Sequence, residues 1–330
     1  MDHLTVAVVG LGKMGLLHAS ILNVIPNVEV IALCDKSSLL LKFVKKLFKT
    51  AKVVDDVEKL VDLDLDSVFV TTPIPAHFPV VKTIYSKKVT RNLFVEKTLA
   101  SSWDKAKELC DLAQGYGGVN MVGYMKRFAV TFGKAKKMLN QGVLGELTSF
   151  DAYAYSSDFS GIQRSSEMSA SRGGTLRDLG SHVIDLALWF FGDLEVHSAT
   201  LESIFNRNCE DTAHFTVKKP GLEGQFHISW CMDNYRLPDF GLTIRGYKGI
   251  MKVNDDKLEL KLNDGTSFMW YRHDLNDNVN FLFGEREYYR EDEYFAKSIL
   301  SGNNAEPSFE TASKVDYVID QVKRNAANNV

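Results

Sequence analysis

The chain has 330 residues, of which 45% are hydrophobic and 25% charged, a globular composition long enough for two domains. The net charge of −3 argues against nucleic acid or an anionic membrane as a general partner, and we expect neither. No apolar run approaches the roughly 20 residues that span a bilayer. The N-terminus also lacks the basic segment and cleavage site of a signal peptide. We therefore expect a cytoplasmic protein.

The first 120 or so residues alternate short apolar runs with helical patterns. Such alternation predicts βαβ units, whose parallel sheet is covered by helices on both faces. The expected strands are 6–10, 28–35, 67–73, 92–97 and 118–124, and the expected helices are 14–24, 37–48, 78–86 and 102–114.

After Tyr124 the pattern changes to longer alternating strands, which predict a large, mostly antiparallel sheet. Helices over 132–140, 176–192, 285–300 and 310–324 accompany the strands 147–156, 196–205, 212–219, 224–231, 242–247, 249–253, 257–262 and 267–272. We place the domain boundary at residue 123. Helices on one face of such a sheet leave the other face for a second copy, so we expect a homodimer or homotetramer through this sheet.

A glycine motif opens the first helix. Gly10–Gly15 reads G-x-G-x-x-G between a strand and a helix, and Asp35 ends the next strand 20 residues later. In this context the motif predicts a Rossmann domain over residues 1–123 that binds a dinucleotide. The expected cofactor contacts from this motif and the next strand ends are Gly10, Gly12, Lys13, Met14, Gly15, Asp35, Thr72, Pro73 and His77. For His77, a surface or helix-start role is equally compatible.

Asp35 bears on which dinucleotide is bound. A carboxylate there accepts hydrogen bonds from the ribose hydroxyls and repels a 2′-phosphate, which favours NAD over NADP. Lys36 and Ser37 could help to hold a phosphate, so NADP stays open.

Glu96 and Lys97 end the fourth strand, at the edge where ligands of parallel sheets bind. With them the chain resembles the Gfo/Idh/MocA oxidoreductases, the family of glucose–fructose oxidoreductase and inositol 2-dehydrogenase. The segments that carry the resemblance are Gly10–Gly15, Thr72–Pro73 with His77, Glu96–Lys97, Gly123 to Phe128, 139–145 and 173–192. The family usually has a proline where this chain has Thr98.

The resemblance implies that Glu96 and Lys97 contact the cofactor and that Lys97, Asp178 and His182 meet at the nicotinamide. The chemistry agrees, because oxidising a secondary alcohol needs a base that works near pH 7. His182 is the expected base, Lys97 the group that stabilises the reacting oxygen, and Asp178 the group that orients the substrate or the imidazole. The expected activity is NAD(P)-dependent hydride transfer to or from a sugar, polyol or nucleotide sugar.

Other interpretations of residues 175–189 stay open. Asp178, His182, Asp185 and Trp189 recur three or four residues apart and so share one helix face. Thr175 and Asp178 could form a capping box, and His182 could be a core residue. Asp178, His182 and Asp185 could also ligate a metal, although we expect none, with Asp185 in a supporting role.

The residues of the second domain (124–330, α+β) would bind the substrate. Besides Lys97, Asp178 and His182, the candidate contacts are Tyr124, Arg127, Tyr153, Tyr155, Arg164 and Arg172. Arg164, Arg172 and Arg177 would suit an anionic substrate such as a sugar phosphate or nucleotide sugar, although a solvated loop explains them equally well. Two alternatives on the same fold are a non-catalytic NAD-binding regulator and an NAD-dependent glycoside hydrolase.

Overall fold

The computed structural model describes residues 3–158, 172–205, 209–281 and 284–328. The chain forms two compact units, the first of Met1–Met125 with Val279–Asp316 and the second of Lys126–Asn278 with Tyr317–Val330. A single boundary at residue 123 does not anticipate this return of residues 279–316 to the first unit.

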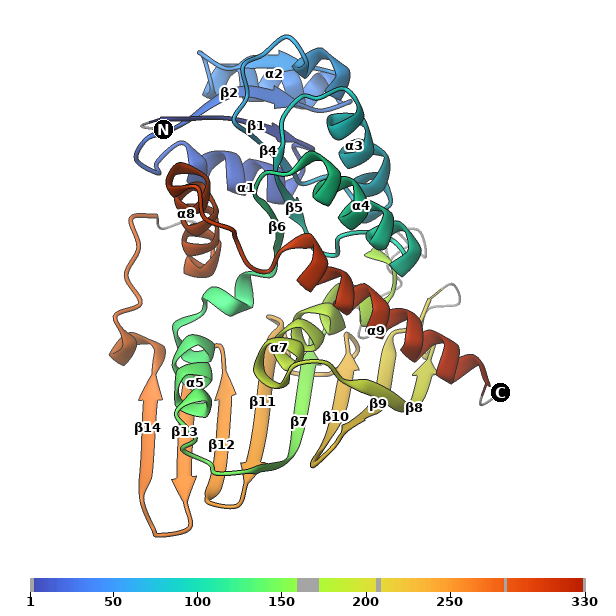
Figure 1. Cartoon of the computed structure of the whole chain (residues 1–330), viewed down its shortest axis with the longest axis vertical. Coiled ribbons are helices and arrows are strands. Elements are labelled where there is room, and N and C mark those ends of the chain that lie inside the picture. The colour runs from blue at the N-terminus through green and yellow to red at the C-terminus, as the bar shows by residue number, and fades with distance from the viewer. Residues whose placement is uncertain (1–2, 159–171, 206–208, 282–283, 329–330) are drawn as a thin grey trace. The chain divides into compact units, whose positions relative to one another are not determined.

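The first unit is built on a six-stranded parallel sheet in the order β3-β2-β1-β4-β5-β6. Its central strands are buried along their whole length, as expected for a sheet covered on both faces. Figure 1 shows α1 and α8 on one side of these strands and α3 and α4 on the other. The strands are β1 (Leu4–Val9), β2 (Val28–Cys34), β3 (Lys52–Val54), β4 (Ser67–Val70), β5 (Asn92–Glu96) and β6 (Asn120–Gly123). The helices are α1 (Lys13–Leu22), α2 (Ser38–Leu47), η1 (Val57–Leu60), α3 (Ile74–Ser86), α4 (Trp103–Tyr116), η2 (Met125–Phe128, which crosses into the second unit), α8 (Arg286–Ser301) and the start of α9 (Phe309–Asn328).

Residues 279–316 complete the core of the first unit. Phe295 of α8 is fully buried and packs its ring against the rings of Phe69 and Phe94, whose centroids lie 5.5 and 5.7 Å away. Beside the edge strand β6, the Val122 N–H donates to the Pro307 carbonyl over 2.9 Å. The last segment is therefore part of the fold of the first unit.

The second unit holds an eight-stranded sheet in the order β14-β13-β12-β11-β7-β10-β9-β8. The pairing of β7 with β10 is parallel and the other pairings are antiparallel. Its strands are β7 (Leu147–Tyr155), β8 (Glu195–Glu202), β9 (Thr212–Lys219), β10 (Leu222–Ser229), β11 (Asp239–Gly246), β12 (Gly249–Asn254), β13 (Lys257–Leu262) and β14 (Ser267–Tyr271). Among the described residues, the helices wholly within this unit are α5 (Val130–Asn140), the π-helical turn η3 (Leu176–Gly180), α7 (Ser181–Phe191) and η4 (Arg272–Leu275).

Burial alternates along these strands, which separates a core face from a partly exposed face. In β7, Phe150, Ala152 and Ala154 are buried, whereas Asp151 and Tyr153 between them are partly exposed. The helices α5 and α7 pack on the sheet (Figure 1). The predicted fold class, a Rossmann domain followed by a large mostly antiparallel sheet, is confirmed.

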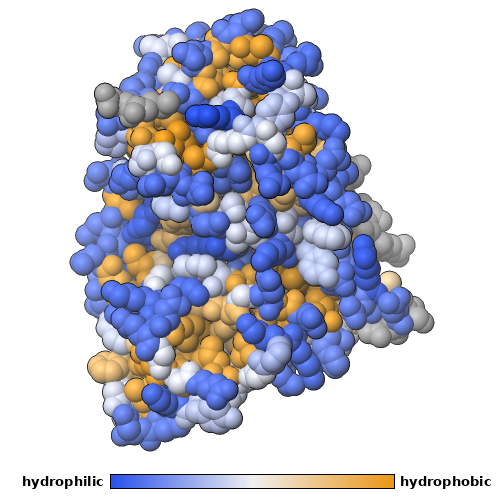
Figure 2. Space-filling view, viewed as in Figure 1, coloured by the Kyte–Doolittle hydropathy of each residue, from blue (hydrophilic) through white to orange (hydrophobic). Residues whose placement is uncertain are grey.

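The side chains on the surface agree with this separation of buried and exposed residues. Figure 2 shows apolar side chains as separate patches among hydrophilic ones on the face that it displays. None of the helices in the described part of the chain is long and apolar enough to cross a membrane.

Candidate active site

Each glycine of the Gly10–Gly15 loop has its own steric setting. Gly10 has φ +94°, and a Cβ there would lie 2.7 Å from the Thr72 nitrogen. At Gly15 a Cβ would overlap the Gly10 carbonyl oxygen, which explains how α1 packs so closely on β1. At Gly12 a Cβ would meet no described atom within 4 Å. Because Gly12 has no Cβ, the approach to the N-terminus of α1 is open, and the unpaired N–H groups there favour anions.

A cavity of about 470 Å³ lies beside this loop. Gly10, Asp35, Thr72 and Pro73 line it, at the carboxyl ends of β1, β2 and β4. The hydroxyl of Thr72 is buried there and has no hydrogen-bond partner among the described residues. A buried polar atom without a partner is rare in a native protein unless a ligand or water satisfies it. These residues therefore fit a bound dinucleotide.

The carboxylate of Asp35 is held in a fixed orientation. It accepts the backbone N–H of Leu11 over 2.6 Å and that of Ser37 over 2.7 Å. Asp35 thereby connects the glycine loop to the end of β2 and the start of α2, and Ser37 caps α2 by accepting the Leu40 N–H. The same carboxylate lines the cavity, as a ribose-binding group must.

The charges around the cavity favour a ligand without an extra phosphate. Asp55, Asp56 and Glu58 line it together with Asp35, whereas Lys36 is the one cationic side chain among its described lining residues. Asp55 and Glu58 are paired with Lys59 and Lys87. Asp35 and Asp56 are therefore the carboxylates that would most oppose the charge of a 2′-phosphate. Sequence reasoning missed the three carboxylates after β3, because that strand has only three residues and the sequence did not reveal it.

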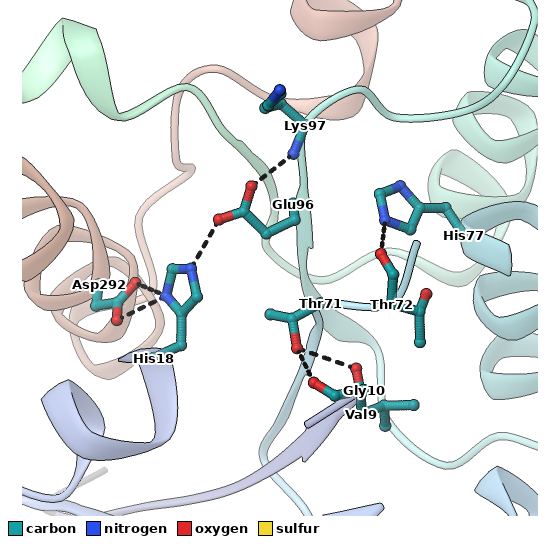
Figure 3. A network of polar contacts seen from close by, with 9 residues as sticks. All are labelled: Val9, Gly10, His18, Thr71, Thr72, His77, Glu96, Lys97 and Asp292. Carbon is teal, nitrogen blue, oxygen red and sulfur yellow. Dashed lines mark hydrogen bonds and ion pairs between the residues drawn. The ribbon is translucent and has the colours of Figure 1, made fainter. Parts of the chain in front are cut away.

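His77 and Glu96, two predicted cofactor contacts, are both buried in a polar network (Figure 3). The two ring nitrogens of His77 lie 2.8 Å from the Thr98 carbonyl and 2.7 Å from the Thr72 carbonyl. Burial is the largest influence on His77 and lowers its pKa, which favours the neutral imidazole. Glu96 binds His18 and the Lys97 backbone N–H. Both predicted contacts thus connect loops that border the cofactor domain's carboxyl edge.

In the second unit, Asp178 lies in a π-helical turn immediately before α7. The Arg172 guanidinium donates to Asp178 over 3.2 Å and to Asp158 over 3.1 Å. Thr175 is in a helical conformation and its side chain makes no capping hydrogen bond, so the capping-box alternative is wrong. π-helical turns inside helices are often found at functional sites.

His182 follows in the first turn of α7. His182 is only 6% exposed, and its ring packs edge-on against the ring of Phe240, with the ring centroids 5.1 Å apart. The carboxylate of Asp178 belongs to the preceding turn. An imidazole in such a place can exchange a proton with a bound hydroxyl group.

Asp185, the third residue of the predicted polar face, forms an ion pair with Arg127. Asp185 accepts two hydrogen bonds from Arg127, of 2.8 Å from Nε and 2.7 Å from Nη2, and the two side chains are 1% and 8% exposed. The guanidinium also lies 5.7 Å from the centroid of Trp189. Arg127 was predicted to contact substrate, and the structure places it in this support. Among the described residues, no three side chains of the kinds that ligate metals are grouped to hold one.

The tyrosines differ in their surroundings. Tyr124 is fully buried in the first unit. Tyr153 and Tyr155 of β7 stack with ring centroids 5.1 Å apart, and the Tyr153 hydroxyl donates to Asp239 over 3.0 Å. Burial and the neighbouring Asp239 raise the pKa of Tyr153, which keeps its hydroxyl protonated. The predicted contact Arg164 lies outside the described residues.

Two family models match the chain. One, described as "Oxidoreductase family, NAD-binding Rossmann fold", covers residues 4–124, and the other, "GFO/IDH/MocA C-terminal domain", covers 132–252. The chain belongs to the Gfo/Idh/MocA oxidoreductase family. The resemblance seen in the motifs is thereby confirmed, and NAD is the cofactor of the first domain.

Relatives within the Gfo/Idh/MocA family are distant in sequence. An uncharacterised oxidoreductase of Schizosaccharomyces pombe is 26% identical over 280 residues, which are 82% of this chain and 75% of that protein. The inositol 2-dehydrogenase of Rhizobium meliloti is 22% identical, covering 91% of this chain and 89% of its own length. The D-glucoside 3-dehydrogenase of Escherichia coli is 28% identical, covering 61% and 57%.

Solved structures share the fold. A levoglucosan dehydrogenase in complex with NADH and levoglucosan has a TM-score of 0.89 at 19% identity, covering 99% of this chain and 98% of that one. A probable dehydrogenase from Thermotoga maritima has a TM-score of 0.82 at 21% identity, with coverage of 99% and 98%. This member of the Gfo/Idh/MocA family therefore has the same architecture at low sequence identity.

Proposed function

We propose that the protein is an NAD-dependent dehydrogenase that oxidises a secondary hydroxyl group of a sugar or polyol, or reduces the corresponding ketone. The observation that carries the proposal is the nearly buried imidazole of His182 one turn after the partly exposed carboxylate of Asp178. A non-catalytic regulator would have no need for this pair. The relatives named inositol 2-dehydrogenase and D-glucoside 3-dehydrogenase support a carbohydrate substrate.

In this proposal each residue has one role. Bound NAD supplies the acceptor for the hydride that leaves the alcohol carbon. His182 accepts the hydroxyl proton, because an imidazole suits proton transfer near neutral pH. The Lys97 ammonium stabilises the negative charge that develops on the oxygen. Asp178, held by Arg172, orients a substrate hydroxyl, and in the reverse direction the same groups protonate the carbonyl.

The experiment is a screen for NADH formation followed by two variants. Purified protein with NAD is offered myo-inositol, scyllo-inositol, glucose, methyl β-D-glucoside, levoglucosan, glucose 6-phosphate and UDP-glucose. On the best substrate, Lys97→Met and His182→Ala should each lower kcat by about 100-fold or more, in the range that general acid–base groups contribute. The Kd for NAD should change by less than about threefold.

Matched controls are available in each unit. Lys105→Met removes an exposed lysine of α4, and His273→Ala removes a histidine whose side chain is 77% exposed. Both should keep the activity of the unchanged protein. Full activity in both Lys97→Met and His182→Ala would refute the assigned roles. Tight NAD binding without turnover of any substrate would favour a regulator, and product release without net NADH would favour a glycoside hydrolase.

The partly exposed face of the eight-stranded sheet supports the proposed homo-oligomer. Asp151, Thr243 and Lys252 stand in register across β7, β11 and β12 on this face, and the apolar side chain of Ile250 is 41% exposed on the same face of β12. A sheet face left open in this way can pair with a second copy. Light scattering after gel filtration should give a dimer or tetramer. A cytoplasmic location belongs to the same proposal.

A further inference from the structure

A buried chain of charged groups runs from α8 to the end of β5 in the first unit (Figure 3). His18 of α1 is 0% exposed. Its Nδ1 lies 2.8 and 2.9 Å from the two carboxylate oxygens of Asp292, and its Nε2 lies 2.8 Å from Glu96 Oε1. One imidazole thus contacts two carboxylates from elements that are remote in the sequence.

The imidazole between these carboxylates is charged. Burial opposes the charge, but Asp292 and Glu96 outweigh it and raise the pKa of His18 well above its ordinary value. Burial alone would raise the pKa of Glu96, yet the hydrogen bond from His18 and its charge lower it. Burial raises the pKa of Asp292. The pair of His18 and Glu96 is therefore an ion pair, with Asp292 as the second acceptor.

The other groups that face His18 are aromatic. Phe69 and Phe94 lie with ring centroids 6.0 and 5.2 Å away, and Tyr288 of α8 meets the imidazole edge-on at 5.9 Å. Burial and the charge of Glu96 raise the pKa of Tyr288, so its hydroxyl stays neutral. Besides Lys97, whose charge acts on Glu96, the ionised groups of this network are His18, Glu96 and Asp292, which we call the triad.

The second oxygen of Glu96 reaches the backbone of Lys97. The Lys97 N–H donates to Glu96 Oε2 over 3.1 Å. In Figure 3 the side chain of Lys97 points away from the Glu96 carboxylate while its backbone N–H points toward it. The orientation of that peptide group sets the direction in which the lysine side chain leaves β5. A fixed carboxylate therefore fixes the starting point of the lysine.

We propose that His18 and Asp292 are positioning residues, which hold Lys97 in its orientation through the carboxylate of Glu96. The expected effect on catalysis rests on the proposed function of Lys97, whereas the expected effect on the Lys97 backbone does not. Without the His18 cation, the buried Glu96 carboxylate would lose the cation to which it is hydrogen-bonded. That loss is costly unless Glu96 takes up a proton or rotates. In either case it would accept the Lys97 N–H less well.

Hydrogen exchange of the cofactor-free protein tests the geometry without any turnover. Asp292→Asn keeps the size of the side chain and removes its charge. We expect the Lys97 amide to exchange about tenfold faster in this variant, with the Val95 amide of the same strand unchanged. Equal exchange at Lys97 in both proteins would overturn the inference, and so would a uniform rise along β5, which indicates general loosening.

Turnover on the best substrate of the screen tests the consequence. Asp292→Asn should lower kcat by about tenfold or more and leave the Kd for NAD within about twofold. Phe295→Leu is the matched control, because it disturbs the packing of the same helix against Phe69 and Phe94 without touching the triad. It should lower stability and keep kcat. A kcat for Asp292→Asn within twofold of the unchanged protein would count against the inference.

A second pair of variants decides the matter if Asp292→Asn does not fold. Glu96→Gln keeps an oxygen that can accept the Lys97 N–H, whereas Glu96→Ala removes it. Glu96→Gln should therefore retain at least about tenfold more kcat than Glu96→Ala, and equal losses would overturn the inference. If Lys97→Met itself has full activity, the proposed catalytic role of Lys97 fails, while the exchange result at Lys97 still stands or falls by itself.

Discussion

Gly12→Ala separates cofactor binding from folding more cleanly than any other change in the glycine loop. Gly12 has φ −65° and ψ −167°, which alanine also adopts, and its added methyl group would meet no described atom within 4 Å. The methyl would instead occupy the space in which the backbone approaches the pyrophosphate. We therefore expect a protein that folds normally and binds NAD weakly.

The magnitudes follow from these contacts. Because the methyl group contacts nothing in the protein, the free energy of unfolding should change by no more than about 0.5 kcal/mol. Forcing a methyl group into a tightly packed contact costs about 1–3 kcal/mol. That cost corresponds to a rise in the Kd for NAD of about 5- to 150-fold.

Calorimetric titration with NAD and urea unfolding measure the two quantities. Gly15→Ala is the matched comparison, since its methyl group would overlap the Gly10 carbonyl and also lie 2.8 Å from Thr71 Oγ1. This second variant should lose about 3 kcal/mol or more of stability. Unchanged NAD affinity in Gly12→Ala would refute the assignment of this loop to the pyrophosphate.

Three further predictions concern charged groups. Asp185→Ala leaves the buried guanidinium of Arg127 without its anion and should lower the free energy of unfolding, measured in urea, by about 3–5 kcal/mol. The double variant Arg127→Met with Asp185→Leu should recover most of that loss. A loss below about 1 kcal/mol in Asp185→Ala would contradict this prediction. Asp35→Ser should weaken NAD binding by about tenfold and narrow the preference over NADP, and an unchanged ratio of the two Kd values would argue against the ribose contact. The pKa of His18 is raised in the folded state, so its charge stabilises fully below the unfolded value of about 6.5 and less as the pH rises toward the folded value. His18→Asn should therefore lower the free energy of unfolding most below about pH 6.5 and progressively less above it. A difference in unfolding free energy that does not change with pH would show that the charge contributes nothing.

Hydrophobic patterning predicted most of the elements because each strand shows its burial in its own residues. β4 and β5 are apolar throughout and lie inside the parallel sheet, while β7 alternates and has one buried face. The order of the strands in a sheet, in contrast, is not shown by the pattern within each strand. The parallel pairing of β7 with β10 was therefore not predictable, because a strand has the same alternation beside either kind of neighbour.

The return of α8 to the first unit was hidden for a similar reason. The helical pattern over 285–300 predicted the helix correctly, and the structure has Arg286–Ser301. An amphipathic helix shows which of its faces is buried, but not which domain covers that face. The partner of Asp292 is His18, which lies 274 residues earlier.

The sequence singles out individual residues of the candidate site, but it does not show how they pair. Asp178, His182 and Asp185 were identified from their spacing, yet the spacing could not show that Arg127 holds Asp185 or that Arg172 holds Asp178. His18 was missed, although a signal existed. It shares a helix face with Gly15, Ala19 and Leu22, all buried, and a histidine on such a face needs polar partners.

The path of the chain between the two units has a consequence for synthesis and truncation. The polypeptide leaves the first unit after residue 125, re-enters it at 279 and leaves it again after 316. The segment that is translated first therefore lacks Phe295 and the Asp292 partner of His18 until α8 has been translated. A fragment ending at residue 125 would expose Phe69 and Phe94 and leave His18 with Glu96 but without Asp292. The NAD-binding half should therefore not be obtainable as a stable, separately expressed domain.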